Sequence, residues 1–258
     1  MMDLGGDNMA NKFIDRTGET NINKQGLKMT IIKYNGHMDI DVGFEDGYIS
    51  TNKSYTSFKN GSIKNVYYRD IYGIACIGNA TSNYNNIKKK PYNRWFKMLQ
   101  RCYDEDFKKE HPTYNNCYVC DEWLCYENFE KWWNEHYYEL EGEWVELDKD
   151  ILIKGNKVYS PETCVFVPKA INILFKKHKK ESNLPLGVYF HRGKYTSQLN
   201  EDSRKRKWLG DFNTPEEAFY AYKEAKEKEI KRVADLYKDK IPQKLYEAMY
   251  SYEVEITD

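Results

Sequence analysis

The spacing of hydrophobic residues changes along the chain, and these changes predict three folded segments. Residues 17–80 hold short runs of β-branched and aromatic residues, including Met29–Tyr34, Asp39–Phe44 and Ile71–Gly78, with Asn-Gly and Asp-Gly pairs between runs. Such runs predict antiparallel strands joined by tight turns. Residues 92–180 instead place apolar side chains at helical spacing in two stretches. We therefore expect an α+β multidomain protein that begins with a small β-barrel or meander.

Polar stretches mark the boundaries between these segments. Residues 1–16 are polar and contain glycines, so we expect a disordered N-terminus. Residues 81–91 are polar and hold three consecutive lysines before Pro91, which is typical of a linker. The predicted domains are a β domain at residues 17–80, a central α+β domain at residues 92–180 and a closing module at residues 184–258.

The central domain combines amphipathic helices with an acidic cluster. Helices are predicted near residues 94–103 and 127–136, because apolar residues repeat there every three or four positions. The acidic cluster, residues 146–152, leads through a Gly-Asn turn to a short strand and a further helix. Five tryptophans are expected to pack between the helices as core residues: Trp95, Trp123, Trp132, Trp133 and Trp144.

The closing module reads as three strands followed by a helix. Gly187–Leu199 predicts two strands, and Lys207–Phe212 predicts a third. Thr214, Pro215 and Glu217 then combine an N-cap hydroxyl, a proline at the first helical position and a glutamate three residues after the cap. The apolar stripe of this helix can cover one face of the sheet. The other face is left free.

Charge is segregated along the chain although the 40 basic and 40 acidic residues cancel. Residues 176–207 contain ten Lys and Arg against three Asp and Glu, whereas residues 120–150 contain two against eleven. The first segment can meet phosphate groups, and the second would repel them unless a metal ion intervenes. No apolar run approaches the roughly 18 residues that span a bilayer, and the N-terminus lacks a signal-peptide pattern. We expect a cytoplasmic protein with reduced cysteines and no membrane partner.

The polar face of the predicted sheet suits nucleic acid. Because side chains alternate along a strand, Lys194, Gln198 and Asn200 share one face, while Tyr195 and Leu199 share the other. Long polar side chains on such a face can reach base edges or phosphates. The basic run at residues 204–207 lies at a turn, where contacts to backbone phosphates provide affinity rather than specificity. A solvated basic turn is the alternative.

The whole closing module resembles the AP2 family of DNA-binding domains found in phage proteins and mobile-element endonucleases. The resemblance covers about 55 residues and rests on GVYFHRGKYTSQL, KWLGDF, TPEEA and AYKEA. It implies that a three-stranded sheet backed by a helix enters the major groove of double-stranded DNA. The implied reading face consists of Arg192, Lys194, Tyr195, Gln198, Asn200, Arg204, Lys207 and Trp208.

The central domain resembles phage proteins related to HNH homing endonucleases. The resemblance rests on the order W..ML.RCY, V.C.EW..Y.NF..W, LDKDI and GN.VYSPETC.FVP..IN. In that family a β-hairpin and a helix hold one divalent metal, a histidine acts as general base and an asparagine orients it. The resemblance places Asp148 and Asp150 as ligands of Mg²⁺ or Mn²⁺, and Asn156 as the orienting residue. Lys149 stands where the histidine is expected, and a lysine is ordinarily protonated at neutral pH.

Three interpretations of the acidic cluster stay open: a divergent nuclease, a nuclease-like domain without catalysis, and a solvated acidic surface. The cysteines offer a zinc alternative, because Cys117 and Cys120 form one CxxC pair that other thiols could complete. The candidate thiolate ligands are Cys102, Cys117, Cys120 and Cys164, with Cys125 as a further option. Small buried core cysteines are the alternative to zinc.

The β domain at residues 17–80 resembles SH3-like barrels that precede AP2 modules, and it carries no catalytic constellation. Together these features predict a phage or prophage protein of the homing-endonuclease kind that binds double-stranded DNA sequence-specifically, in association with the bacterial nucleoid. Either the central domain also cleaves phosphodiester bonds with a divalent metal, or the protein is a non-enzymatic DNA-binding regulator. A protein-interaction adaptor is the third alternative, and no partner of the β domain is predicted.

Overall fold

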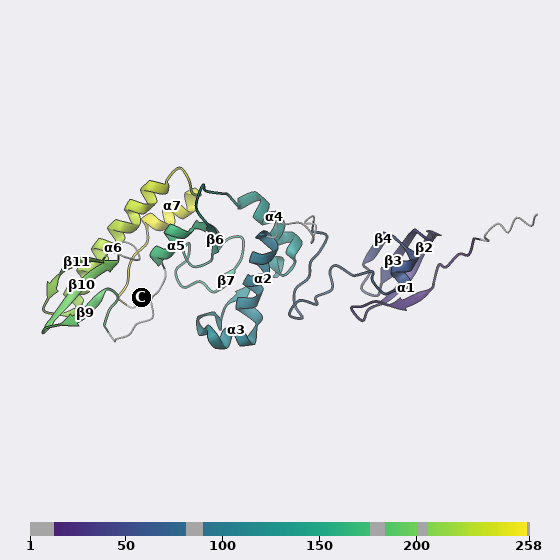
Figure 1. Cartoon of the computed structure of the whole chain (residues 1–258), viewed down its shortest axis with the longest axis horizontal. Coiled ribbons are helices and arrows are strands. Elements are labelled where there is room, and N and C mark those ends of the chain that lie inside the picture. The colour runs from purple at the N-terminus through teal and green to yellow at the C-terminus, as the bar shows by residue number, and fades with distance from the viewer. Residues whose placement is uncertain (1–12, 81–89, 176–183, 201–205, 257–258) are drawn as a thin grey trace, which may run out of the picture. The chain divides into compact units, whose positions relative to one another are not determined.

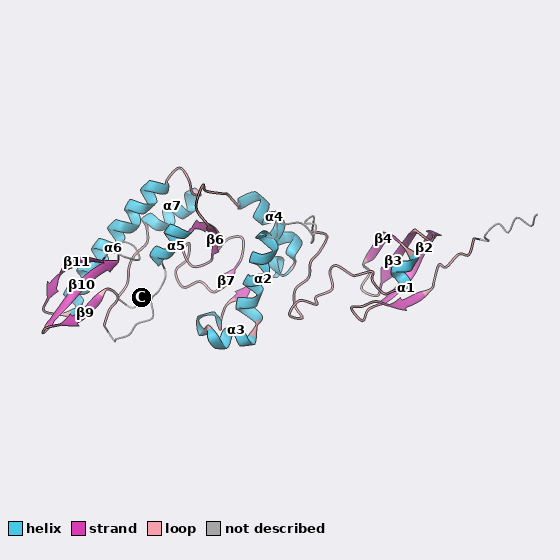
Figure 2. Cartoon of the chain, in the orientation of Figure 1, coloured by secondary structure: helices cyan, strands magenta, loops and turns pink. Residues whose placement is uncertain are grey.

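The computed structural model describes residues 13–80, 90–175, 184–200 and 206–256, so most of the predicted N-terminal tail and linker lies outside the described residues. The described residues form helices and several small sheets, which confirms the predicted α+β class (Figures 1 and 2). The chain divides into two compact units. The first comprises residues 1–88 and 124–128, and the second comprises residues 89–123 and 129–258. In the described part of the chain, no helix has the length and apolar character needed to cross a membrane.

The first unit is built on a four-stranded antiparallel sheet with the order β1-β2-β3-β4. The strands are β1 (Thr20–Ile22), β2 (Lys28–Gly36), β3 (Asp39–Phe44) and β4 (Ile49–Lys53). Alternate residues of β3 are buried because one face of the sheet covers the core. A short helix, α1 (Tyr55–Lys59), is capped by Ser54 and buries Tyr55 and Phe58 in that core.

This sheet is an open meander, and the expected barrel is not formed by the described strands. The sheet ends at β1 on one side and at β4 on the other. β1 has only three residues, and α1 covers the core where further strands would have to close a barrel. The strand expected at Ile71–Gly78 is also replaced, by a bridge from Ile71 to Ala75 and a parallel bridge from Cys76 to Cys125. That second bridge accounts for residues 124–128 belonging to this unit.

The second unit begins with helices around an aromatic core. Its first elements are α2 (Lys90–Tyr103), α3 (Glu105–Glu110), η1 (Pro112–Tyr114), β5 (Tyr118–Val119), η2 (Asp121–Leu124) and α4 (Tyr126–His136), of which residues 124–128 belong to the first unit. Trp95, Trp123, Trp132 and Trp133 are buried as expected. Trp144 is the exception, because it is 70% exposed. The expectation of a core position for Trp144 was therefore wrong.

The acidic cluster lies in a strand, strand, helix arrangement. β6 (Val145–Asp148) pairs antiparallel with β8 (Val165–Pro168), and α5 (Lys169–Phe175) follows β8 directly. β7 (Val158–Tyr159) lies between them in sequence but pairs in parallel with β5. The segment from β6 to β7 is therefore a long loop rather than a tight turn. Residues 148–157, which begin with Asp148 and Asp150 and also hold three lysines, are called the acidic loop below.

The closing module forms a three-stranded antiparallel sheet with the order β11-β10-β9. Its elements are β9 (Val188–His191), β10 (Lys194–Asn200), β11 (Arg206–Phe212), α6 (Pro215–Tyr237) and α7 (Gln243–Tyr250). Thr214 and Glu217 make the reciprocal hydrogen bonds of a capping box at the start of α6. Ala218, Phe219 and Tyr222 of α6 then pack on one face of the sheet.

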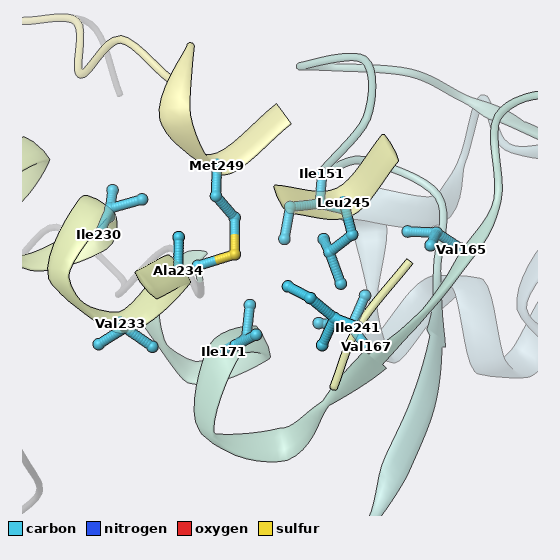
Figure 3. Packing of buried hydrophobic residues seen from close by; sticks show 10 residues of the cluster. All are labelled: Ile151, Val165, Val167, Ile171, Ile230, Val233, Ala234, Ile241, Leu245 and Met249. Carbon is cyan, nitrogen blue, oxygen red and sulfur yellow. The ribbon is translucent and has the colours of Figure 1, made fainter. Parts of the chain in front are cut away.

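A second core joins the closing helices to the acidic region. Figure 3 shows Ile230 and Ala234 of α6 with Leu245 and Met249 of α7, close to Ile171 of α5. Val165 and Val167 of β8 belong to the same cluster. A contiguous set of buried apolar side chains is the usual mark of a single folding core. Within the second unit, the predicted central domain and the closing module thus share buried contacts.

Candidate nucleic-acid interface and acidic loop

The face of the β9–β11 sheet that points away from α6 carries polar and aromatic side chains. Residues directly opposite each other on antiparallel strands have side chains on the same face. Gln198 of β10 lies opposite Trp208 of β11, and Asn200 lies opposite Arg206. On the other side of β10, Lys194 lies opposite His191 and Thr196 lies opposite Tyr189. We call this surface the outer face; it comprises Tyr189, His191, Lys194, Thr196, Gln198, Asn200, Arg206, Trp208 and Asp211.

Two large aromatic side chains of the outer face are exposed. Trp208 is 62% exposed and Tyr189 is 48% exposed. Between them, Thr196 Oγ1 donates a hydrogen bond of 2.6 Å to Asp211 Oδ1 and cross-links β10 to β11. Lys194 Nζ donates to Asn213 Oδ1 at 2.5 Å. Exposed aromatic groups among polar side chains mark a surface that suits a binding partner.

The predicted reading face is divided between the two sides of the sheet. Lys194, Gln198, Asn200 and Trp208 lie on the outer face. Tyr195 packs in the core beneath α6, so its assignment to the reading face was wrong.

Lys207 also lies on the helix side of the sheet, contrary to the prediction. It is paired with the buried Leu199, and it lines a groove with Ala221 and Lys228 of α6. Arg192 occupies the β9–β10 turn, and Arg204 lies outside the described residues.

Five residues of the outer face were absent from the predicted reading face: Tyr189, His191, Thr196, Arg206 and Asp211. Arg192 and Gly193 both have positive φ, 48° and 77°, as a two-residue type I′ hairpin turn requires. That turn sets His191 opposite Lys194 and Tyr189 opposite Thr196. The two-residue turn between β9 and β10 could have predicted these pairs, because the length of a hairpin turn determines the register of the two strands. A bulge between Ser197 and Gln198 shifts the pairing with β11, and this shift decides where Arg206 lies.

In the acidic loop, Asp148 closes a tight turn with the backbone that follows it. Asp148 Oδ1 accepts hydrogen bonds of 2.8 Å from the backbone N–H groups of Asp150 and Ile151. Burial raises the pKa of Asp148 above its ordinary value, while the same two N–H groups act in the opposite direction. Asp148 is thus a turn-forming residue whose charge is disfavoured by burial.

Lys149 is buried, and its ammonium group is enclosed by oxygen atoms. Lys149 Nζ donates to Asp150 Oδ1 at 2.7 Å, to Asp150 Oδ2 at 2.8 Å and to the carbonyl oxygen of Asn156 at 2.8 Å. Its Nζ also lies 5.7 Å from the centre of the Tyr159 ring. An ammonium group has three N–H donors and no acceptor. Because three acceptors surround it, Lys149 is arranged as a counter-ion and not as a general base.

Asn156 holds the two ends of the acidic loop together. Its Nδ2 donates to the carbonyl oxygens of Lys149 and Val158, both at 2.7 Å, and its Oδ1 accepts from Val158 N at 3.1 Å. Asn156 therefore fixes the backbone of residue 149. The residue it positions is a lysine.

The acidic loop does not fit the divalent metal that the nuclease resemblance implies. Among the described residues, no group of three or more His, Cys, Asp or Glu side chains is arranged to hold a metal ion. Asp148 Oδ1 is engaged by backbone N–H groups, and both carboxylate oxygens of Asp150 are engaged by Lys149. A metal ion with oxygen ligands needs several of these atoms at once.

The cysteines of the zinc alternative are mostly buried thiols. Cys102, Cys117 and Cys164 are buried, and Cys120 is partly exposed. Burial raises the pKa of both Cys102 and Cys164 to about 12. In the described part of the chain these cysteines belong to no group of three or more metal-ligating side chains, and burial of this kind is common for core cysteines. Cys102 lies near Cys117, and Cys76 and Cys125 of the first unit form a second neighbouring pair.

Arg101 is a further residue of this region that the sequence did not single out. It lies in the last turn of α2, is partly buried, and hydrogen-bonds the side chain of Tyr159. Its guanidinium also lies 5.7 Å from the centre of the Tyr114 ring. Arg101 thus connects α2 to Tyr159 of β7 and to Tyr114 of η1. Nothing in the helical spacing indicates that an arginine would face this way.

Comparison with protein-family models, with curated proteins and with solved structures found no match to this chain.

Proposed function

We propose that this protein binds double-stranded DNA sequence-specifically through the outer face of the β9–β11 sheet. The observation that supports the proposal is the pairing of exposed aromatic and polar side chains on a sheet face that α6 leaves uncovered. The resemblance of residues 187–237 to AP2 domains supports the same function. β-Sheets of this kind can enter the major groove and present side chains to the base edges.

Each type of side chain on the outer face has a chemical role in this proposal. Gln198 and Asn200 have amide groups that can make paired hydrogen bonds to adenine, and Arg206 can make paired hydrogen bonds to guanine. Lys194 and the turn residue Arg192 are suited to backbone phosphates. Trp208 and Tyr189 supply apolar and stacking surface. The face thereby combines base contacts with phosphate contacts.

For the central domain we propose a non-catalytic role, which makes the protein a DNA-binding regulator of the homing-endonuclease kind. The supporting observation is Lys149, which stands in the place of the general base and has all three donors satisfied. None of the described histidines belongs to the acidic loop. With its three donors directed at these oxygen atoms, Lys149 is positioned as a hydrogen-bond donor to the loop.

Binding is tested by fluorescence anisotropy on DNA ligands selected from a random duplex library. The expected result is enrichment of a common sequence that the protein binds at least about 10³-fold more tightly than unrelated duplex DNA. Equal affinity for selected and unrelated duplexes would contradict sequence-specific binding.

Catalysis is tested separately by incubating supercoiled plasmid, with the selected site inserted, with the protein and Mg²⁺ or Mn²⁺. We expect the plasmid to stay supercoiled. Nicking that is lost in the variant Asp148→Asn, with binding unchanged, would refute the non-catalytic role and restore the nuclease interpretation.

A further inference from the structure

In the acidic loop, oxygen atoms surround the ammonium group of Lys149. The two carboxylate oxygens of Asp150 and the carbonyl oxygen of Asn156 surround Lys149 Nζ at 2.7–2.8 Å. The Lys149 side chain is only 6% exposed, whereas that of Asp150 is 53% exposed. The cation is thus held from the buried side, while its carboxylate partner remains open to solvent.

The backbone around the oxygen ligands is positioned by contacts that do not involve the Lys149 side chain. Asp148 Oδ1 holds the backbone N–H groups of Asp150 and Ile151, and this fixes the turn that carries Asp150. Asn156 is fixed by its bonds to the backbone of Lys149 and Val158. The backbone that carries Asp150 and the carbonyl oxygen of Asn156 is therefore expected to keep its path when the Lys149 side chain is shortened.

We propose that Lys149 is the permanent counter-ion of the acidic loop and occupies the position that a divalent cation would otherwise take. The loop of the natural protein consequently folds without a metal ion and does not take one up. Replacing Lys149 by a short neutral side chain converts the same oxygens into a site for a hard divalent or trivalent cation. Carboxylate and carbonyl oxygens are the ligands that Ca²⁺, Mg²⁺ and Mn²⁺ prefer. This proposal concerns the loop alone and does not depend on DNA binding.

Terbium luminescence provides a direct test, because Tb³⁺ binds oxygen ligands and is excited through a nearby tyrosine. The cation position lies 5.7 Å from the Tyr159 ring, which makes Tyr159 a built-in sensitiser. We expect Lys149→Ala to bind Tb³⁺ at least about tenfold more tightly than the natural protein, because a repelling unit charge has been removed. The double variant Lys149→Ala with Asp150→Asn is expected to lose this gain.

Two controls test whether the gain in Tb³⁺ affinity depends on where the charge is removed. Lys157→Ala removes an exposed lysine of the same loop and is expected to leave Tb³⁺ binding at the level of the natural protein. Lys149→Arg keeps a cation at the position and is expected to do the same. Equal gains for Lys149→Ala and Lys157→Ala would overturn the proposal, since surface charge alone would then explain them.

A second measurement uses the natural sequence and remains decisive if Lys149→Ala fails to fold. The melting temperature of the natural protein is measured with EDTA, with Mn²⁺ and with Ca²⁺. We expect no difference among the three conditions. A rise of the melting temperature with Mn²⁺ or Ca²⁺ that disappears in Asp150→Asn would overturn the proposal, because the loop would then already hold a metal ion.

Discussion

Gln198 of β10 lies directly opposite Trp208 of β11, on the sheet face that α6 leaves open. The amide can form hydrogen bonds to a base edge, and the neighbouring indole can exclude water from those bonds. A buried hydrogen bond gains strength when water is excluded. This pair is the centre of the proposed DNA interface.

Replacing Trp208 by alanine should weaken DNA binding by about 1–3 kcal/mol, the usual loss for an aromatic group that stacks on or packs against a base. Because Trp208 is 62% exposed, its removal should leave the melting temperature nearly unchanged. Anisotropy titrations on the selected duplex measure the loss. Trp144→Ala is the matched control, since Trp144 is 70% exposed and lies outside the sheet. Equal losses for the two variants would argue against the outer face.

The two faces of the sheet should differ in their dependence on salt. Neutralising Lys194 of the outer face or Arg192 of the β9–β10 turn should reduce the slope of log affinity against log salt by about one for each phosphate that the side chain had neutralised. Lys207→Gln should leave the slope unchanged, because Lys207 lies on the helix side with Leu199. Titrations at three or more salt concentrations measure the slopes. A reduced slope in Lys207→Gln alone would reverse the assignment of the two faces.

Asn156 should contribute more to stability than an ordinary half-buried asparagine. Its side chain makes three hydrogen bonds to the backbone at the two ends of the acidic loop. We expect Asn156→Ala to lower the free energy of unfolding by about 2–4 kcal/mol, as measured by urea denaturation. Asn172→Ala is the control; the described contact of Asn172 is one bond of 2.6 Å to Glu146, and its loss should cost about 1 kcal/mol. If Asn156→Ala lowered the free energy of unfolding by less than Asn172→Ala does, the hydrogen bonds of Asn156 would not stabilise the loop as proposed.

The raised pKa of Asp148 predicts a dependence of stability on pH. Its pKa in the folded protein lies above the ordinary value of 3.8, chiefly because of burial, so the folded state favours the protonated form. Stability is therefore lost as pH rises through the folded pKa.

Asp148→Asn keeps a side-chain oxygen for the turn but carries no charge. The variant should gain stability over the natural protein as pH rises above 3.8, and the difference should vanish in stronger acid. Melting temperatures of both proteins across this range provide the measurement. A difference that grows towards low pH would contradict it.

Local signals in the sequence predicted the parts of the structure that depend on neighbouring residues. Thr214, Pro215 and Glu217 predicted the start of α6, because a capping box involves four consecutive positions. The alternation along β10 predicted that Lys194, Gln198 and Asn200 share a face, since strand geometry alone decides this.

Features that depend on distant residues were not predictable in the same way. Whether Lys207 or Trp208 faces outward depends on the pairing of β11 with β10 and on a bulge, and no pattern within β11 indicates either. Closure of a barrel depends likewise on whether β1 meets β4. The partners of Lys149 come from a loop whose path the composition of the acidic cluster does not specify.

The core in Figure 3 limits how freely the DNA-binding end of this chain could be exchanged between proteins. Ile230 and Ala234 of α6 are covered by α7 and by Ile171, which precedes the closing module in the sequence. A graft that began at residue 184 would keep α7 but lose Ile171 and the β8 residues Val165 and Val167, and the apolar surface that they cover would be exposed and prone to aggregate. A transplantable unit would have to begin before β6, at about residue 145, and would carry the acidic loop with it.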